Sequence, residues 1–460
     1  MHNRSRTPRL DRRSFLTRSA LAGAITMATP FQALLAAGPR QVKKGRGPSP
    51  DYGPLQPAID ETTGLPLLHL PEDFKYLSFG WTDDVMSDGI PTPALHDGMA
   101  AFPAGHGRVR LVRNHEVGDG PDAFAPGLAY DPEAGGGTTT LEFDTLRGEL
   151  VGSWSSISGT LRNCAGGATP WASWLTCEET TLSAGFGDLT KNHGYILEVP
   201  AMGTAVPTAY TAMGRFSHEA VAVDPATGWV YETEDAGSNS GFYRFRPHSF
   251  GALGGGGILE MLGVKGAFQF DTRTNQTGEW LDVEWHVIDN PDPNLAAGQP
   301  SVFSQGFGKG AARFARLEGA WPGHGRIYFL STSGGNVAQG QIFEYDPLEE
   351  RMRLLFESPS AEVLNAPDNM CVSPRGGLVL CEDGSGMEFV HGLTLDGTIF
   401  RFIQNNVDLR ATPVGRFNQD YRGSEFAGSC YSPDGRWLFV NIQSPGISFA
   451  ITGPWRSGGI

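Results

Sequence analysis

The residues of this chain that could do chemistry are mostly carboxylates that close short apolar runs, together with one cysteine and one arginine. Carboxylates that meet at one point cannot all stay ionised unless protons or cations neutralise them. Oxygen ligands suit hard ions, calcium above all, and a thiolate beside them adds a preference for a transition metal. Because neighbours along a strand point to opposite faces, we expect one residue of each adjacent pair to face the site. The candidates are Glu116, Cys164, Glu178, Glu179, Glu219, Glu234, Asp235, Arg316, Glu318, Asp368, Glu382, Asp383 and Glu425.

Each candidate also has a plainer interpretation. A single acid can be a solvated loop carboxylate or a structural partner. Arg316, two residues before Glu318, is either a bidentate clamp for an anion or one half of a surface salt bridge. His115 and His218 each precede a glutamate, and we expect them to form hydrogen bonds beside the site rather than to bind metal. Because these residues recur at equivalent places, the pattern supports a shared site for the whole set and not for any one residue.

Six copies of one sequence pattern must position these residues. Each copy has a polar start, a stretch of small residues, a turn that is often rich in Pro and Gly, and an apolar run that ends on polar residues. A strand, a turn and a second strand repeated in this way predict an all-β fold, a six-bladed β-propeller with loop insertions, whose carboxylates surround one axis. The copies span residues 97–116, 163–179, 218–235, 316–333, 368–383 and 425–443, with closing strands at 109–113, 174–177, 229–233, 327–330, 378–380 and 437–440.

The longest gap between copies separates the third from the fourth. Residues 236–315 contain four consecutive glycines, Gly254–Gly257, and two tryptophans, Trp280 and Trp285. Two interpretations stay open for this segment. It is either a cap over the channel mouth or an ordinary blade with long loops.

The chain divides into three parts. Residues 1–37 contain a twin-arginine pattern at Asp11–Thr17 and a modestly apolar stretch after it, which predicts a signal peptide for the twin-arginine route. A membrane anchor or a chance basic tail is the alternative, but a proline and a glutamine interrupt the apolar run. Residues 38–64 are expected to be a linker, and 65–460 a single catalytic β-propeller domain. We therefore expect a periplasmic or secreted protein with no integral membrane segment in the mature chain.

The chain is acidic, with a formal charge of −15 that falls to about −20 without residues 1–37, which carry six arginines and one aspartate. An acidic surface argues against nucleic acid or anionic lipid as the main partner. If the substrate is itself an anion, bound cations must reverse the local field.

Five cysteines leave at least one thiol unpaired in an exported protein. Cys164 is a metal ligand, a small buried hydrophobe, or half of a disulfide with Cys177. Cys371 and Cys381 flank a turn and form the other possible pair. The sequence does not choose between these pairings.

Several of these residues lie in segments that resemble the PhoX alkaline phosphatase family. The run Asn163–Glu179, which holds Cys164, a Thr-Pro-Trp segment and the Glu178-Glu179 pair, is the most specific. The likeness spans nearly the whole mature chain in the expected order, although the family's Arg-Pro-Glu segment is Arg-Leu-Glu here. The other matching segments are Asn114–Glu116, Phe216–Glu219, Pro367–Asn369 and Phe439–Gly446.

The resemblance implies an exported, monomeric six-bladed propeller that hydrolyses phosphate monoesters. It implies two Fe³⁺ ions and two to three Ca²⁺ ions joined by a bridging oxo group. Glu219 would be shared between iron and calcium, and Asp383 or a neighbour would complete the calcium shell. Carried over by motif, the iron ligands are Cys164, Glu219 and Glu318, the calcium ligands are Glu116, Glu179 and Asp383, and the residue that binds the phosphoryl group is Arg316.

Two other functions remain as alternatives. The first is a calcium-stabilised binding propeller without turnover. The second is a calcium-dependent lactonase or phosphotriesterase, whose site needs no thiolate. The sequence has no Gly-x-Ser-x-Gly nucleophile elbow and no phosphate loop. We therefore expect any hydrolysis to depend on bound metals.

Overall fold

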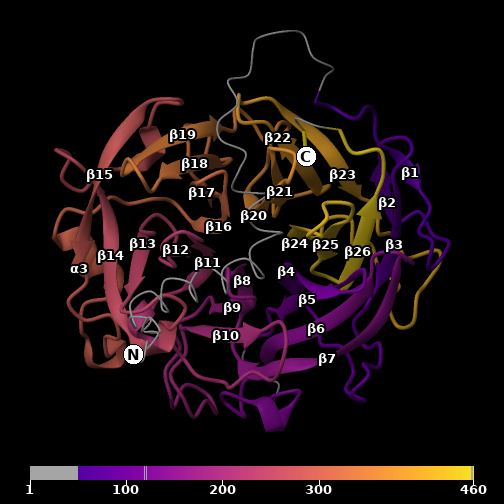
Figure 1. Ribbon diagram of the computed structural model, residues 1–460, viewed down its shortest axis with the longest axis horizontal. Helices are drawn as coiled ribbons and strands as arrows, with labels where there is room; N and C mark the ends of the chain where they lie inside the picture. The colour runs from indigo at the N-terminus through magenta and orange to yellow at the C-terminus, as the bar shows by residue number, and fades with distance from the viewer. Residues whose placement is uncertain (1–49, 119, 121, 457–458) are drawn as a thin grey trace, which may run out of the picture. The chain divides into compact units, whose positions relative to one another are not determined.

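The computed structural model of the chain describes residues 50–460 except for positions 119, 121, 457 and 458 (Figure 1). Most regular elements in this part are β-strands, as the sequence predicts, and the helices are short. Residues Gly47–Ile460 form one unit, and the signal peptide expected at 1–37 lies outside the described residues. Among the described residues, no helix combines the length and the apolar character needed to cross a membrane.

The described strands form five sheets in which every pairing is antiparallel. The first sheet contains β4 (His96–Gly105), β5 (Arg108–His115), β6 (Gly136–Asp144) and β7 (Glu149–Thr160), and the second contains β8 (Asn163–Ala168), β9 (Ser173–Glu178) and β10 (Ile196–Pro200). The third sheet contains, in spatial order, β11 (His218–Val223), β12 (Val230–Glu234), β13 (Phe242–Pro247), β14 (Gly257–Val264), β15 (Trp280–Val287), β19 (Arg351–Glu357), β18 (Gln341–Asp346), β17 (Arg326–Ser331) and β16 (Leu317–Gly323).

The last two sheets combine strands from both ends of the described chain. The fourth sheet contains β20 (Pro367–Val372), β21 (Leu378–Glu382), β22 (Phe389–Leu393), β23 (Ile399–Asn405), β2 (Leu68–Leu70) and β1 (Gln56–Ala58). The fifth contains β24 (Phe426–Tyr431), β25 (Leu438–Ile442), β26 (Ile447–Thr452) and β3 (Lys75–Phe79). The short helices lie in connections and are η1 (Pro126–Leu128), η2 (Thr211–Met213), η3 (Leu253–Gly255), η4 (Thr272–Thr274), η5 (Leu295–Ala297) and α3 (Val302–Gly308).

Six strands, which we call the inner strands, surround the centre of the described unit. They are β4, β8, β11, β16, β20 and β24, and their labels encircle the middle of the view in Figure 1. Each inner strand contacts the next in chain order, and β24 contacts β4. Strands that meet around one axis while their sheets extend outward are the arrangement of a β-propeller. The fold is therefore all-β and propeller-like.

Strands that precede the first inner strand close this arrangement. β3 pairs with β26, and β2 pairs with β23, so sequence-distant strands complete the fourth and fifth sheets. This pairing covers strand edges that would otherwise be exposed. β1 pairs with β2, so the segment expected to be a linker at 38–64 contributes residues 56–58 to a sheet.

The long segment between the third and fourth sequence copies adds outer strands. β14 pairs with β13, and β15 pairs with both β14 and β19, which joins two groups of four strands into the nine-stranded third sheet. Helix α3 contacts β14. β15 is therefore the central strand of this sheet, four places from either inner strand, so β13, β14 and β15 belong to the sheet and not to a cap.

Small residues let the inner strands approach each other. A Cβ atom on Gly98 would lie 2.6 Å from the Cα atom of Ala165, and one on Gly319 would lie 2.8 Å from the carbonyl oxygen of Asp368. Beyond these glycines, the side chain of Trp321 packs against four of the hydrophobic clusters. Apolar side chains therefore pack around Trp321 on one side of the glycines. The polar side chains lie on the other side, at the starts of the inner strands.

Candidate metal centre

Every inner strand has a shift of register near its start, where it pairs with the second strand of its sheet. Such β-bulges re-aim side chains and are common beside active sites. In five of the six inner strands, the second residue carries a carboxylate or a thiol, and all five side chains are buried. We call these residues the inner ring: Asp97, Cys164, Glu219, Glu318 and Asp368. In β24 the same place holds Ala427, and Glu425 lies just before that strand.

A second set of residues directly follows the second strand of each group. We call this set the rim, and all of its members except the buried Thr332 are partly exposed. The backbone N–H of each rim residue donates to the carbonyl of the residue just before the inner strand, over 2.9 to 3.2 Å. The six donor and acceptor pairs are Glu116 and Leu95, Glu179 and Arg162, Asp235 and Ser217, Thr332 and Arg316, Asp383 and Ala366, and Gln443 and Glu425. One repeated backbone contact therefore places every rim side chain.

The inner ring and the rim together bring ligand atoms close to one another. Three overlapping groups have ligand atoms that all lie within 4.8 Å of one another. Because Cys164 and Glu219 each belong to two groups, the three groups form one continuous cluster. The groups are Asp97, Glu116 and Cys164; Cys164, Glu179 and Glu219; and Glu219, Glu318 and Asp368.

The structure thus brings together five of the six residues that the sequence predicts as metal ligands: Glu116, Cys164, Glu179, Glu219 and Glu318. The sixth, Asp383, belongs to the rim but to none of the three groups. Its charge nevertheless raises the pKa of both Asp368 and Glu425, so it lies beside the cluster.

Two members of the cluster were not among the predicted ligands. Asp368 was a candidate from the sequence pattern but was not assigned as a ligand through the family motifs. Asp97 is the first residue of the first sequence copy and was not a candidate. Both could have been found from one signal, because each precedes a small residue as the other ring members do. The pairs are Asp97 and Gly98, Cys164 and Ala165, Glu219 and Ala220, Glu318 and Gly319, and Asp368 and Asn369.

The buried acids raise one another's pKa values. Burial, followed by the charge of Asp368, raises the pKa of Glu219 and of Glu318 well above its usual range. Burial and then the charge of Asp383 raise the pKa of Asp368 to about 7. Burial and then Asp97 likewise raise the pKa of the Cys164 thiol. Protons or cations are needed to neutralise this cluster, as the sequence predicts.

Unpartnered polar atoms show that the donor set fits metal ions. Among the described residues, neither carboxylate oxygen of Glu219 accepts a hydrogen bond, and neither does Oδ1 of Asp97, although all three atoms are buried. Buried oxygens without donors are costly unless an ion or a water satisfies them. Many carboxylate oxygens with one thiol match the preferences of a hard ion beside a transition metal.

Two arginines lie among these acids. Nη2 of Arg316 lies 2.6 Å from Oε1 of Glu318, and its Nε lies 3.1 Å from Oδ2 of Asp235. Nη2 of Arg162 lies 2.7 Å from Oε2 of Glu179 and 3.2 Å from Oε1 of Glu116. The ion pairs of Arg316 are therefore part of the site. Arg162 was not predicted, although it lies two residues before Cys164 as Arg316 does before Glu318.

The remaining candidates lie beside the cluster. His115 bonds to the carbonyl of Ala94 and to Oγ1 of Thr139, and His218 bonds to the carbonyl of Gly214, so neither is part of a ligand group. All five cysteines are buried and free, so neither of the disulfides considered from the sequence is present.

A family model and several solved structures are similar to this chain. A family model described as alkaline phosphatase PhoX matches residues 50–151 and 142–446. No curated protein matches the chain. Among solved structures, PhoX of Pseudomonas fluorescens in complex with vanadate, a transition state analogue, is 18% identical with a TM-score of 0.63, over 84% of this chain and 96% of that chain. A gluconolactonase of Xanthomonas campestris is 16% identical with a TM-score of 0.44, over 87% of this chain and 98% of that chain.

Proposed function

Because the chain belongs to the PhoX family of alkaline phosphatases, we propose that its acid cluster is the metal centre at which it hydrolyses phosphate monoesters. The protein is a metal-dependent phosphatase. The observation that carries the proposal is the continuous cluster through Cys164 and Glu219, in which both oxygens of Glu219 and Oδ1 of Asp97 are buried without a donor among the described residues. No single acid would carry it.

The donor set supports an assignment of ligands. Cys164, Glu219 and Glu318 would hold iron, because the thiol lies there with two almost completely buried carboxylates. Partly exposed rim carboxylates would hold calcium, which accepts flexible oxygen shells. Asp97 and Asp368 join this set, since each shares a group with a predicted ligand. The calcium ligands on the rim would be Glu116, Glu179 and Asp383.

When bound, Fe³⁺ and Ca²⁺ would supply the Lewis acidity that activates water and offsets the charge of the phosphoryl oxygens. Arg316 binds those oxygens, because its fork of donors matches the geometry of a phosphoryl group. Its partners Glu318 and Asp235 hold the guanidinium in place from two sides. A fixed cation at the position where charge develops stabilises the transition state without reorganising.

We propose that the described unit is one propeller of six blades, formed by residues 65–460 with β1 added at the edge of the fourth sheet. The closed series of six inner strands supports this count, and so does the backbone bond that recurs six times between the rim and the residue before each inner strand. On this count the nine-stranded sheet contains two blades that β15 joins.

We further propose that the protein is exported by the twin-arginine route to the periplasm or beyond, and that it acts as a monomer. The arginine pair within residues 1–37 and the membership of the PhoX family support export. A membrane-associated fraction after osmotic release of the periplasm would contradict this localisation.

Elemental analysis of the exported protein, combined with assays on p-nitrophenyl phosphate, tests the function. We expect iron and calcium in the purified protein, loss of hydrolysis on chelation, and recovery only when both metals return. Calcium without iron would favour a lactonase or phosphotriesterase. Calcium without any turnover would favour a binding propeller.

A further inference from the structure

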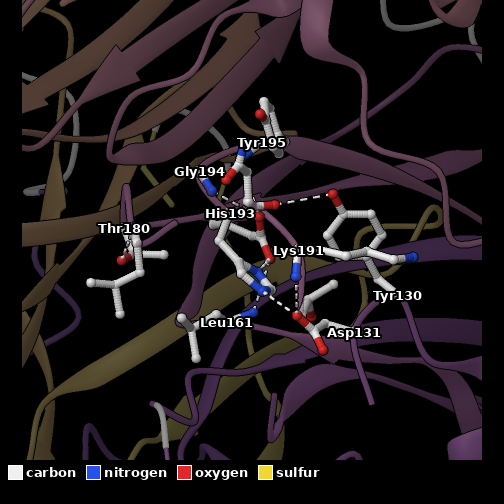
Figure 2. Close-up of polar contacts among 12 residues, drawn as sticks. Tyr130, Asp131, Leu161, Thr180, Lys191, His193, Gly194 and Tyr195 are labelled. Atoms are coloured by element: carbon white, nitrogen blue, oxygen red, sulfur yellow. Dashed lines mark hydrogen bonds and ion pairs between the residues drawn. The ribbon is translucent and has the colours of Figure 1, made fainter. Parts of the chain in front are cut away.

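A fully buried glutamate directly precedes the rim residue Glu179. Glu178 ends β9, and Figure 2 labels four residues that contact it, Leu161, His193, Gly194 and Tyr195. Its Oε1 accepts from the backbone N–H of Leu161 over 3.0 Å, and its Oε2 accepts from Gly194 over 2.9 Å and Tyr195 over 3.2 Å. This carboxylate therefore ties the start of the second sheet to the end of β9.

The side chain of His193 completes the shell of Glu178. Its Nδ1 lies 2.6 Å from Oε1 of Glu178, while its Nε2 lies 3.4 Å from Oδ2 of Asp131. All three side chains are fully buried. Asp131 also accepts from the backbone N–H groups of Thr190 and Lys191 over 2.8 and 2.7 Å (Figure 2). A continuous buried connection thus leads from the rim to the segment between β5 and β6 of the first sheet.

A buried glutamate that precedes a rim residue and is held by a side chain recurs in other sheets. Glu382 ends β21, directly before the rim residue Asp383, and accepts from the backbone N–H of Asn365 over 2.7 Å. His391 Nε2 lies 2.9 Å from the same oxygen. Glu234 ends β12 before Asp235 and accepts from the hydroxyl of Tyr243. In each case a side chain close to or within the third strand holds a buried glutamate whose neighbour is a rim carboxylate.

We propose that His193 is a positioning residue of the metal centre, which fixes Glu178 and thereby the calcium-binding carboxylate of Glu179. This rests on the proposed function, because it takes Glu179 as a calcium ligand. Glu178 and Glu179 are adjacent, so the backbone between them cannot shift while the buried carboxylate keeps its four donors. The backbone bond from Glu179 to Arg162 continues this constraint into the residue before β8.

Without His193, Glu178 would lose a short charge-assisted hydrogen bond in a site that water does not reach. The three backbone donors that remain stabilise the buried anion less well, so we expect the carboxylate to move toward solvent. Movement would pull the end of β9 outward together with Glu179. A rim carboxylate held for calcium would then have to be reorganised on binding, which lowers affinity.

Two substitutions of one residue separate positioning from simple support of the fold. The amide nitrogen of asparagine falls near the place of histidine Nδ1, whereas that of glutamine falls near Nε2. His193→Asn therefore keeps the donor to Glu178, and His193→Gln keeps only the contact with Asp131. We expect His193→Gln to weaken calcium binding at least tenfold by titration calorimetry, and His193→Asn to stay within about threefold of wild type.

Val199→Ala is the matched control, because Val199 is a buried residue of β10 in the same sheet and touches none of these groups. It should lower the melting temperature and leave calcium affinity unchanged. If both His193 variants lose stability equally and keep wild-type calcium affinity, the positioning role is wrong. Should His193→Gln fail to fold, His391→Asn applies the equivalent test at Asp383, because His391 contacts Glu382 through Nε2 and asparagine removes that donor. Wild-type protein that binds no calcium would instead refute the proposed function.

Discussion

Arg162 and Arg316 occupy equivalent positions in the fold, each directly before an inner strand and two residues before a member of the inner ring. Both have positive φ angles, 50° and 48°, and both accept the backbone bond from a rim residue over 2.9 Å. Each guanidinium joins two carboxylates of the site. Two guanidinium groups therefore lie in the acid cluster at equivalent places. They pair with different carboxylates, so we expect them to have different roles.

Replacement of Arg316 tests the phosphoryl clamp. A lysine at this position keeps the charge but cannot donate from a planar fork, so we expect Arg316→Lys to lower kcat/KM for p-nitrophenyl phosphate about 10- to 100-fold. Arg410→Lys is the control, because Arg410 also pairs with two carboxylates but is largely exposed. Equal activity of the two variants would remove Arg316 from the site.

Arg162 competes with cations for Glu116 and Glu179. In Arg162→Gln, the two rim carboxylates lose their shared partner, so the metal-free protein should lose about 1 kcal/mol or less of unfolding free energy. Calcium affinity should rise, because binding no longer displaces a guanidinium. Denaturation in EDTA and calorimetric calcium titration measure the two effects. A fall in calcium affinity would contradict this competition.

Cys164 is the one thiol of the inner ring. We expect Cys164→Ser to lose bound iron and visible absorption together with at least 100-fold of the activity, because a hydroxyl is a far weaker ligand than a thiolate. Cys177→Ala is the control, since Cys177 is buried in a hydrophobic cluster and belongs to no ligand group. Absorption spectra and iron analysis of the two variants decide the matter.

The metal-free protein should become less stable as the pH rises. Burial raises the pKa of Glu179 to about 8, although Arg162 opposes it, and the pKa of Asp368 is raised to about 7. These folded-state carboxyls hold protons that the unfolded chain has released above about pH 4.5. Stability is therefore fully present below that pH and is lost as pH rises through the folded pKa values.

Melting temperatures measured in EDTA between pH 5 and pH 8.5 test this dependence. We expect a steady fall over that range, and calcium added at pH 8 should restore stability because cations replace the protons. A melting temperature in EDTA that does not change with pH would show that the cluster stays ionised without metal.

Gly98 keeps Cys164 in place. A methyl group at this position would meet the Cα of Ala165 at 2.6 Å and the carbonyl oxygen of Cys164 at 2.9 Å. Gly98→Ala should therefore push β8 away from β4 and lower iron content severalfold while the β-sheet signal in circular dichroism remains. Gly127→Ala is the control, because a Cβ there meets nothing within 4 Å.

Local patterns in the sequence were enough to predict the strands and several residues of the cluster. Each predicted closing strand overlaps the second strand of a sheet, from β5 to β25, because apolar alternation between turns depends on nearby residues. The repeated motif likewise located Cys164, Glu219 and Glu318. Asp97 was missed because the small residue after it was not used as a signal, and the direction of its carboxylate depends on a register shift against β5.

The sequence by itself determined that this is an all-β chain with repeated carboxylates and that the set needs cations, since composition and spacing encode both. Only the tertiary structure decided which acids share one cluster. Membership depends on where six bulges turn the side chains and on six backbone bonds from the rim, and both arise between strands. Glu178 and Glu179 illustrate this difference. They are adjacent glutamates, but Glu178 is buried and bonded to His193, whereas Glu179 belongs to the cluster, and only the fold distinguishes them.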